Sequence, residues 1–168
     1  MQNLYNYVFD KTSNTYSFST NHNISYRIVF IVDETFSTIA NQDIPNVFQI
    51  IIEKLTNRLE PLDFKVAKTI EKIIESFFTK VENALIYVCS DDDNRAELRH
   101  NIFDRWYANS QYKDSVVKID NIFVLKSENN KPQKLFTTFM FHKQNSNYHR
   151  LIEIYNMIER VLNTDEEK

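Results

Sequence analysis

The chain of 168 residues contains no glycine, although a chain of this length usually carries about a dozen. Glycine lets the backbone adopt positive φ and approach a ligand closely, so phosphate loops, dinucleotide fingerprints and nucleophile elbows depend on it. The sequence therefore excludes these sites in their standard form. Asparagine tolerates the left-handed region best after glycine, and we expect turns at Asn14, Asn21, Asn23 and Asn129–Asn130. An AT-rich coding sequence would explain the abundance of asparagine equally well.

Length and composition predict one domain. The chain is 42% apolar and carries 13 Phe and 9 Tyr, which is enough for a single core. We expect residues 1–163 to form this domain and residues 164–168 to be a disordered acidic tail. The net charge of −3 and the pI of about 5.8 give no reason to expect binding to nucleic acid or membranes. A lone cysteine and the lack of a signal-peptide pattern predict a cytoplasmic protein.

Periodicity predicts an α+β fold, a mostly antiparallel mixed sheet with helices packed on it. Alternating aromatic side chains predict a hairpin over residues 5–18, and a 3.6-residue apolar repeat predicts a helix over 63–82 with Asp63 as its N-cap. Residues 47–55 fit a helix or a strand, and their alternation favours a strand. The other expected elements are strands at 24–33, 84–89, 115–126 and 133–142, helices at 92–109 and 146–162, and an irregular segment or short helix within 34–46.

The candidate site lies in the helix expected at 92–109. Arg95 and Arg99 fall within its apolar arc, on the stripe of Ile102 and Trp106. A guanidinium directed toward the core needs a partner, and aspartates of the preceding turn are near in sequence. Two interpretations stay open: a structural ion-pair network, or an anion pocket beyond the carboxyl end of an interior strand. The candidate anion-binding residues are Arg95, Arg99, Asp93, Asp92, Cys89 and Trp106.

Other chemistry is weakly indicated. Asp91, Asp92 and Asp93 could ligate Mg²⁺, but consecutive carboxylates diverge and usually cap a helix or face solvent. The four histidines show no ligand spacing, and Cys89, at the end of a buried strand, is expected to be an inert small hydrophobe. We therefore expect no metal and no cofactor, and no catalytic residue is assigned.

One resemblance concerns the residues from Tyr87 to Arg95, followed by Arg99, Phe103 and Trp106 at helical spacing. This pattern resembles the signature of a bacterial family known only as a domain of unknown function. The likeness covers most of the chain and implies no activity. It implies that one unit is formed by Cys89, Asp93, Arg95, Arg99 and Trp106.

A second resemblance concerns the fold. The expected order of strand, helix, strand, helix and hairpin over residues 47–142 is similar to the core of the GNAT acetyltransferase superfamily, and Asn94, Ala96 and Trp106–Tyr107 resemble its Asn, Ala and terminal aromatic residue. In those enzymes a glycine-containing turn binds the coenzyme A pyrophosphate. Here the turn spans Glu60 to Asp63, and its proline and two acidic residues remove an N–H and add negative charge.

These observations predict a non-catalytic interaction or ligand-sensing module in which Arg95 and Arg99 bind an anion. The expected partner is a protein or a small anionic ligand, not nucleic acid or a membrane, and the chain is expected to be a monomer or homodimer. The alternative is an atypical N-acyltransferase with a degenerate coenzyme A site, which would use Cys89, Tyr87 or His100. The general-acid tyrosine of many GNAT enzymes has no clear counterpart here.

Overall fold

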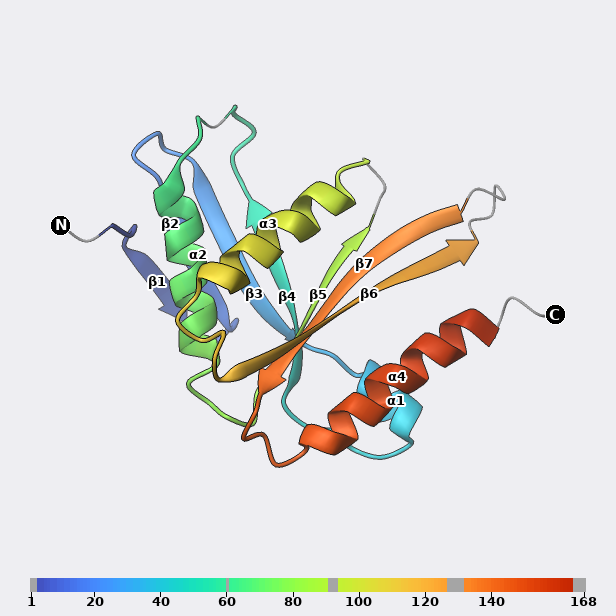
Figure 1. The fold of residues 1–168 in the computed structure, drawn as a ribbon. Coiled ribbons are helices and arrows are strands. Elements are labelled where there is room, and N and C mark those ends of the chain that lie inside the picture. The colour runs from blue at the N-terminus through green and yellow to red at the C-terminus, as the bar shows by residue number, and fades with distance from the viewer. Residues whose placement is uncertain (1–2, 60, 91–93, 127–131, 165–168) are drawn as a thin grey trace.

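The computed structural model describes residues 3–59, 61–90, 94–126 and 132–164, and Figure 1 shows the course of the chain. Each strand and helix expected from the sequence has a counterpart, so the predicted α+β class is confirmed. The elements in chain order are β1 (Tyr7–Asp10), β2 (Thr15–Ser19), β3 (Ser25–Val32), α1 (Thr35–Ala40), β4 (Val47–Lys54), α2 (Phe64–Phe77), β5 (Ala84–Ser90), α3 (Ala96–Asn109), β6 (Val116–Lys126), β7 (Pro132–His142) and α4 (Tyr148–Thr164).

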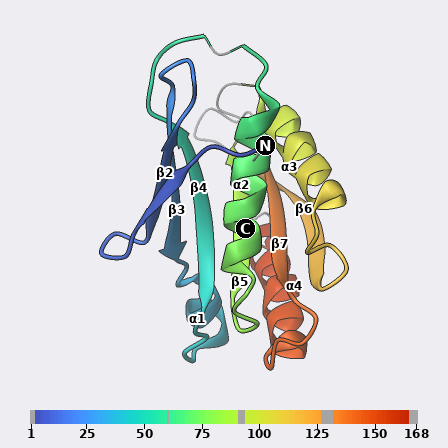
Figure 2. The ribbon, with the colours of Figure 1, turned by 90° about the vertical axis from the view of Figure 1, so that its left-hand side faces the viewer.

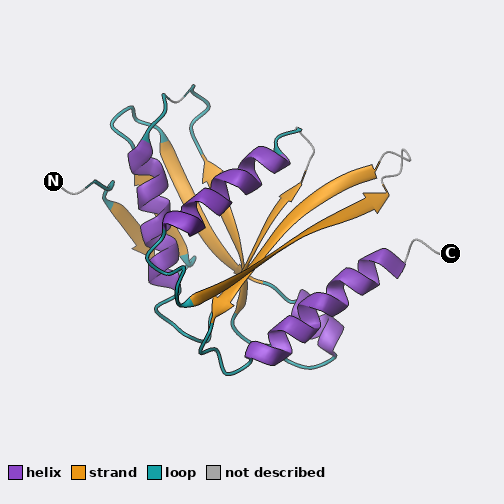
Figure 3. Cartoon of the chain, viewed as in Figure 1, coloured by secondary structure: helices purple, strands orange, loops and turns teal. Residues whose placement is uncertain are grey.

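The described strands, which are orange in Figure 3, form one sheet in the order β1-β2-β3-β4-β5-β7-β6. Every neighbouring pair is antiparallel except β4 and β5, which are parallel. The mostly antiparallel sheet that the sequence predicted is therefore confirmed. The order β4, α2, β5, α3, β6, β7 is also the order expected from the GNAT resemblance.

Helices cover both faces of the sheet. In Figure 1, α2 and α3 lie in the upper half of the view, and α1 and α4 lie together at the lower right. In the turned view of Figure 2, α2 stands between strands β2 to β4 on one side and α3 on the other. None of the described helices is long and apolar enough to cross a membrane.

The strands divide their side chains between two cores because successive residues point to opposite faces. Leu85 of β5 and Met140 of β7 pack in the core beneath α2 and α3. Their neighbours Ile86 and Phe139 pack in the core beneath α1 and α4. Cys89 lies on the α3 side, against Ala96, so the end of β5 brings its thiol beneath the first turn of α3.

Helix α2 begins as the sequence predicted, because the Asp63 carboxylate accepts a hydrogen bond from the Lys65 amide at 2.9 Å. The predicted end near residue 82 is wrong, since the helix stops at Phe77. The side-chain amide of Asn83 donates to the Phe77 carbonyl at 2.8 Å. This bond satisfies one of the carbonyl groups that the end of a helix leaves without a partner.

Asparagine takes the place of glycine in the turns. The positive-φ residues of the described chain are Asn14, Asn23, Asn41, Asn46 and Asn94, with φ between 49° and 63°. The turns expected at Asn14 and Asn23 are therefore confirmed, and Asn129–Asn130 lies outside the described residues. Asn14 also donates its side-chain amide to the Phe30 carbonyl at 2.9 Å, so it fixes its turn against β3.

Candidate functional site

The parallel strands β4 and β5 are paired over only three positions. Their ladder joins Val47 to Ala84, Phe48 to Leu85 and Gln49 to Ile86, after which the strands diverge, as Figure 1 shows. Helix α2 follows β4 and helix α3 follows β5. The divergence of the strands therefore spreads the N-terminal ends of the two helices.

The two arginines of the predicted site differ in burial. Helix α3 begins at Ala96, and Arg95 is its N-cap residue with an exposed side chain. The expected helix start at residue 92, and with it the prediction that Arg95 faces the core, is wrong. Arg99 is half-buried, and its guanidinium hydrogen-bonds the sulfur of Cys89. Asp92 and Asp93 lie outside the described residues.

Cys89 is brought close to Arg99 and Tyr87, and it is only 2% exposed. Burial raises the pKa of the Cys89 thiol, although a hydrogen bond from Tyr87 and the positive charge of Arg99 act in the opposite direction. Burial also raises the pKa of the Tyr87 hydroxyl far above its usual value, and its bond to Cys89 adds to the rise. Both groups are therefore protonated at neutral pH, when neither acts as a base or an anionic nucleophile.

Trp106 lies on the same helix but not beside Cys89. Its ring centroid is 6.0 Å from that of Phe103, which in turn stacks on Tyr87 at 4.2 Å. On its other side Trp106 lines a groove between α2 and α3, which we call the α2–α3 groove, with a volume of about 730 Å³. The apolar wall of this groove consists of Leu62, Phe64, Val66, Ile102 and Trp106.

Two apolar side chains at the α2 end of the groove are strongly exposed, Leu62 at 86% and Phe64 at 73%. The polar residues around the rim are Asp63, Lys68, Glu71, Arg105 and Asn109. The groove therefore combines an apolar wall with a rim of mixed charge. Such a composition suits a ligand with an apolar body and a polar end.

Asp63 determines the electrostatics at the N-terminus of α2. Besides capping the Lys65 amide, its carboxylate accepts a hydrogen bond from the Tyr5 hydroxyl. A helix N-terminus binds anions through its amide groups, but here a carboxylate already occupies that position. The N-terminus of α2 therefore carries a negative charge where a helix would otherwise offer an anion site.

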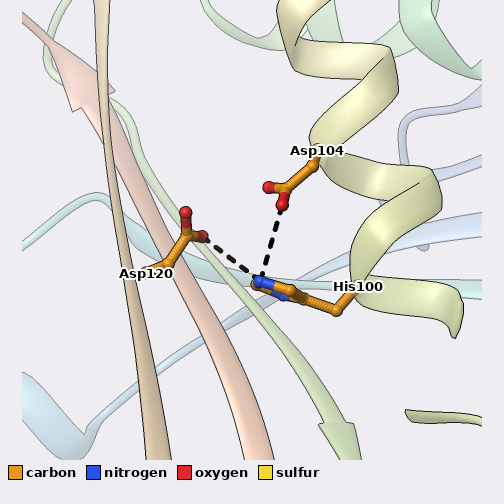
Figure 4. A group of neighbouring side chains, drawn as sticks. All are labelled: His100, Asp104 and Asp120. Carbon is orange, nitrogen blue, oxygen red and sulfur yellow. Dashed lines mark ion pairs between the residues drawn. The ribbon is translucent and has the colours of Figure 1, made fainter. Parts of the chain in front are cut away.

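The opposite flank of α3 carries a second group of polar residues that the sequence analysis missed. His100 and Asp104 of α3 point toward Asp120 of β6, as Figure 4 shows, and the Lys118 ammonium pairs with both carboxylates. We call these four residues the α3–β6 cluster. The spacing of His100 and Asp104, one helical turn apart, was visible in the sequence, whereas β6 enters only through the sheet order.

The model of a family of unknown function, DUF6169, matches residues 62–157. The chain belongs to this family. No curated protein matches it. Among solved structures it is similar to the crystal structure of a "putative phosphinothricin N-acetyltransferase", at 11% sequence identity and a TM-score of 0.48, over 81% of this chain and 75% of that chain. The resemblance to a family of unknown function is thereby confirmed.

Proposed function

We propose that this chain is a non-catalytic binding domain for an acidic amphipathic ligand. The apolar part of the ligand would occupy the α2–α3 groove, and its acidic group would bind Arg99 and Arg95. The observation that carries the proposal is the exposed apolar wall of the groove, with Leu62 and Phe64 projecting from one side and Trp106 from the other. Contiguous exposed apolar surface of this kind marks binding sites in soluble proteins.

The arginines continue the α3 wall of the groove toward the helix N-terminus. Arg99 precedes Ile102 by three residues and Trp106 by seven, so the three side chains share one face of the helix. Arg95 lies one turn further on. Arg99 already hydrogen-bonds Cys89, but a guanidinium carries five N–H donors and can take a carboxylate in addition.

Three further observations support a role without catalysis and a ligand that is not a nucleotide-type cofactor. The Asp63 carboxylate on the Lys65 amide repels a diphosphate at the α2 N-terminus. Cys89 is buried and Tyr87 is partly buried, and both are protonated at neutral pH. His100 points toward Asp104 and Asp120 (Figure 4).

The test uses the single tryptophan of the chain as the reporter. Titration with decanoate should shift the emission of Trp106 and reach saturation, whereas Ile102→Asp should abolish the response because it places a charge in the apolar wall. Arg99→Gln and Arg95→Gln should each weaken decanoate at least tenfold and leave decanol binding unchanged, since decanol lacks the carboxylate. Arg27→Gln, which removes an exposed arginine paired with Glu53, is the matched control.

The structural interpretation of the arginines predicts a different outcome. If Arg99→Ala loses its cooperative thermal transition, Arg99 serves mainly to hold α3 on β5. If the Arg95→Gln protein is folded and binds decanoate like the wild type, the anion site at Arg95 is wrong. If Arg99→Gln and Arg95→Gln weaken decanoate and decanol binding equally, the arginines do not bind the carboxylate, although the groove still binds the apolar chain.

A second candidate function is the atypical N-acyltransferase, and one observation favours it. The pairing of β4 and β5 ends after Gln49 and Ile86, which opens the sheet where GNAT enzymes, by the resemblance noted above, would bind an acyl coenzyme. Thermal unfolding in the presence of acetyl-CoA separates the two functions. We expect no shift in Tm, whereas stabilisation by several degrees at modest ligand excess would favour the enzyme.

A further inference from the structure

We infer that the α3–β6 cluster binds a divalent transition-metal ion of the Zn²⁺ type through His100 Nε2, Asp104 Oδ2 and Asp120 Oδ1. One ligand atom from each of the three residues lies within 4.8 Å of the other two, and the three side chains converge from one helix and one strand (Figure 4). His100 Nε2 is 3.7 Å from the Asp104 oxygen and 3.9 Å from the Asp120 oxygen. Ligands around tetrahedral zinc lie about 3.3 Å apart, so His100 and each carboxylate need to approach by about 0.4–0.6 Å, and the two carboxylates by up to about 1.5 Å. The inference is independent of the ligand proposed for the α2–α3 groove.

The position of His100 is the second observation that points to a cation. The residue is 9% exposed, and its Nε2 has no hydrogen bond to any residue that the structure describes, because both carboxylates lie beyond 3.5 Å. A histidine that simply paired with a carboxylate would approach it to about 2.7–3.2 Å. The Nε2 atom is instead aimed between two carboxylates, at distances compatible with groups that share an ion.

The contacts of Thr138 favour the form of His100 that binds metals. The Thr138 hydroxyl donates to Asp120 Oδ1 at 2.7 Å and lies 3.5 Å from His100 Nδ1. Because this hydroxyl gives its proton to Asp120, it can only accept from the imidazole, which places the ring proton on Nδ1. The lone pair of Nε2 then faces two carboxylates, and a cation between them turns this repulsion into ligation.

Lys118 supplies part of the cation charge in the absence of a metal. Its side chain is 7% exposed, and its ammonium pairs with Asp104 and Asp120. One ammonium leaves a net negative charge on the cluster when His100 is neutral. A dication would compete with Lys118 for the same two carboxylates, so Lys118 should weaken metal binding without preventing it.

The ligand set and its access indicate the kind of metal. One imidazole nitrogen and two carboxylate oxygens suit Zn²⁺, whereas Mg²⁺ and Ca²⁺ favour oxygen ligands alone. Both aspartate side chains are about two-fifths exposed, which gives an ion a path from solvent. His100, on the buried face of α3, and Thr138 of β7 form the inner side of the site.

The test is calorimetric titration of the full chain with ZnCl₂ at pH 7.5 in a buffer without chelators, supported by the visible absorption of added Co²⁺. We expect one equivalent to bind. Asp104→Asn and Asp120→Asn should each weaken binding at least tenfold, and Lys118→Met should strengthen it at least threefold. These positions are used because replacing the buried His100 risks unfolding the domain. His149→Ala, which removes an exposed histidine of α4, should bind like the wild type.

Three outcomes would overturn the inference. The first is a wild-type chain that takes up no Zn²⁺, and the second is unchanged affinity in both Asp104→Asn and Asp120→Asn. The third is a Lys118→Met protein that is folded but binds Zn²⁺ no more tightly than the wild type. Loss of binding in His149→Ala alone would place the metal elsewhere and would also count against the α3–β6 cluster.

Discussion

The two flanks of α3 differ in chemistry although they belong to one helix of 14 residues. The flank toward α2 presents Ile102 and Trp106 to an apolar groove, and the flank toward β6 presents His100 and Asp104 to charged partners. Between them, Ala96 and Phe103 are buried against the sheet. The difference shows that a narrow buried stripe is enough to fix a helix, which leaves both of its sides available for binding.

The largest effect is expected from removing the side chain that separates the two flanks. Phe103 is 1% exposed and stacks on Tyr87, so Phe103→Ala should lower the free energy of unfolding by about 3–5 kcal/mol. Guanidinium unfolding followed by circular dichroism measures this change. Leu98→Ala, at an exposed position of the same helix, should cost about 0.5 kcal/mol or less. A loss below about 1 kcal/mol for Phe103→Ala would contradict the division of α3 into two flanks.

A smaller effect is expected on the charged flank. Lys118→Met leaves Asp104 and Asp120 facing each other, but solvent screens these partly exposed carboxylates, so the loss in unfolding free energy should be about 1–2 kcal/mol. The matched control is Lys72→Met, which breaks an exposed helix pair with Glu75 and should cost about 0.5 kcal/mol or less. Equal losses in urea unfolding of the two variants would mean that the α3–β6 cluster is an ordinary surface network.

The smallest effect is expected in the pH dependence of stability, through Cys89 beneath α3. Burial raises the pKa of the Cys89 thiol, so the folded chain keeps a proton that the unfolded chain releases above its thiol pKa of about 8.5. The stabilisation is fully present below that pH and is lost as the pH rises toward the folded value, by at most about 1.4 kcal/mol per pH unit.

Urea unfolding at pH 7.0, 8.0 and 9.5 measures the slope for wild type and Cys89→Ala. The variant should lose less stability between pH 8.0 and 9.5 than the wild type does. Because the pKa of Tyr87 is also raised by burial, a residual decline near pH 10 is expected in both proteins. If the free energy of unfolding falls equally in wild type and Cys89→Ala from pH 8.0 to 9.5, the thiol has the same pKa in the folded and unfolded states, which would contradict the prediction.

The sequence predicted the fold closely because local signals agreed with the tertiary structure. The apolar repeat around Ile70, Ile73 and Phe77 specified α2, and alternating aromatic residues specified the first hairpin. The predicted start of α3 was wrong because Asp92, Asp93 and Asn94 are all favourable N-cap residues, whereas the helix takes Arg95 as its N-cap, without a side-chain bond.

The site was predicted only in part. Cys89 and Arg99 were expected to form one unit with Asp93, Arg95 and Trp106; Arg99 does lie against Cys89, whereas Trp106 packs on Phe103. The α2–α3 groove and the pairing of His100 with Asp120 depend on which elements lie side by side, which no local periodicity reveals. Thr138 contacts His100 and Asp120 only because β7 lies between β5 and β6 in the sheet.

The left-handed asparagines have a consequence for the unfolded chain. Each keeps a side chain where glycine would leave the backbone freer, so the denatured ensemble has fewer conformations at five turns that must re-form. Folding therefore loses less backbone conformational entropy at these turns than it would if they contained glycine. Asn41→Gly would relieve the steric cost of the positive φ in the native state. It would also increase the number of backbone conformations in the unfolded chain, and folding would then lose more conformational entropy.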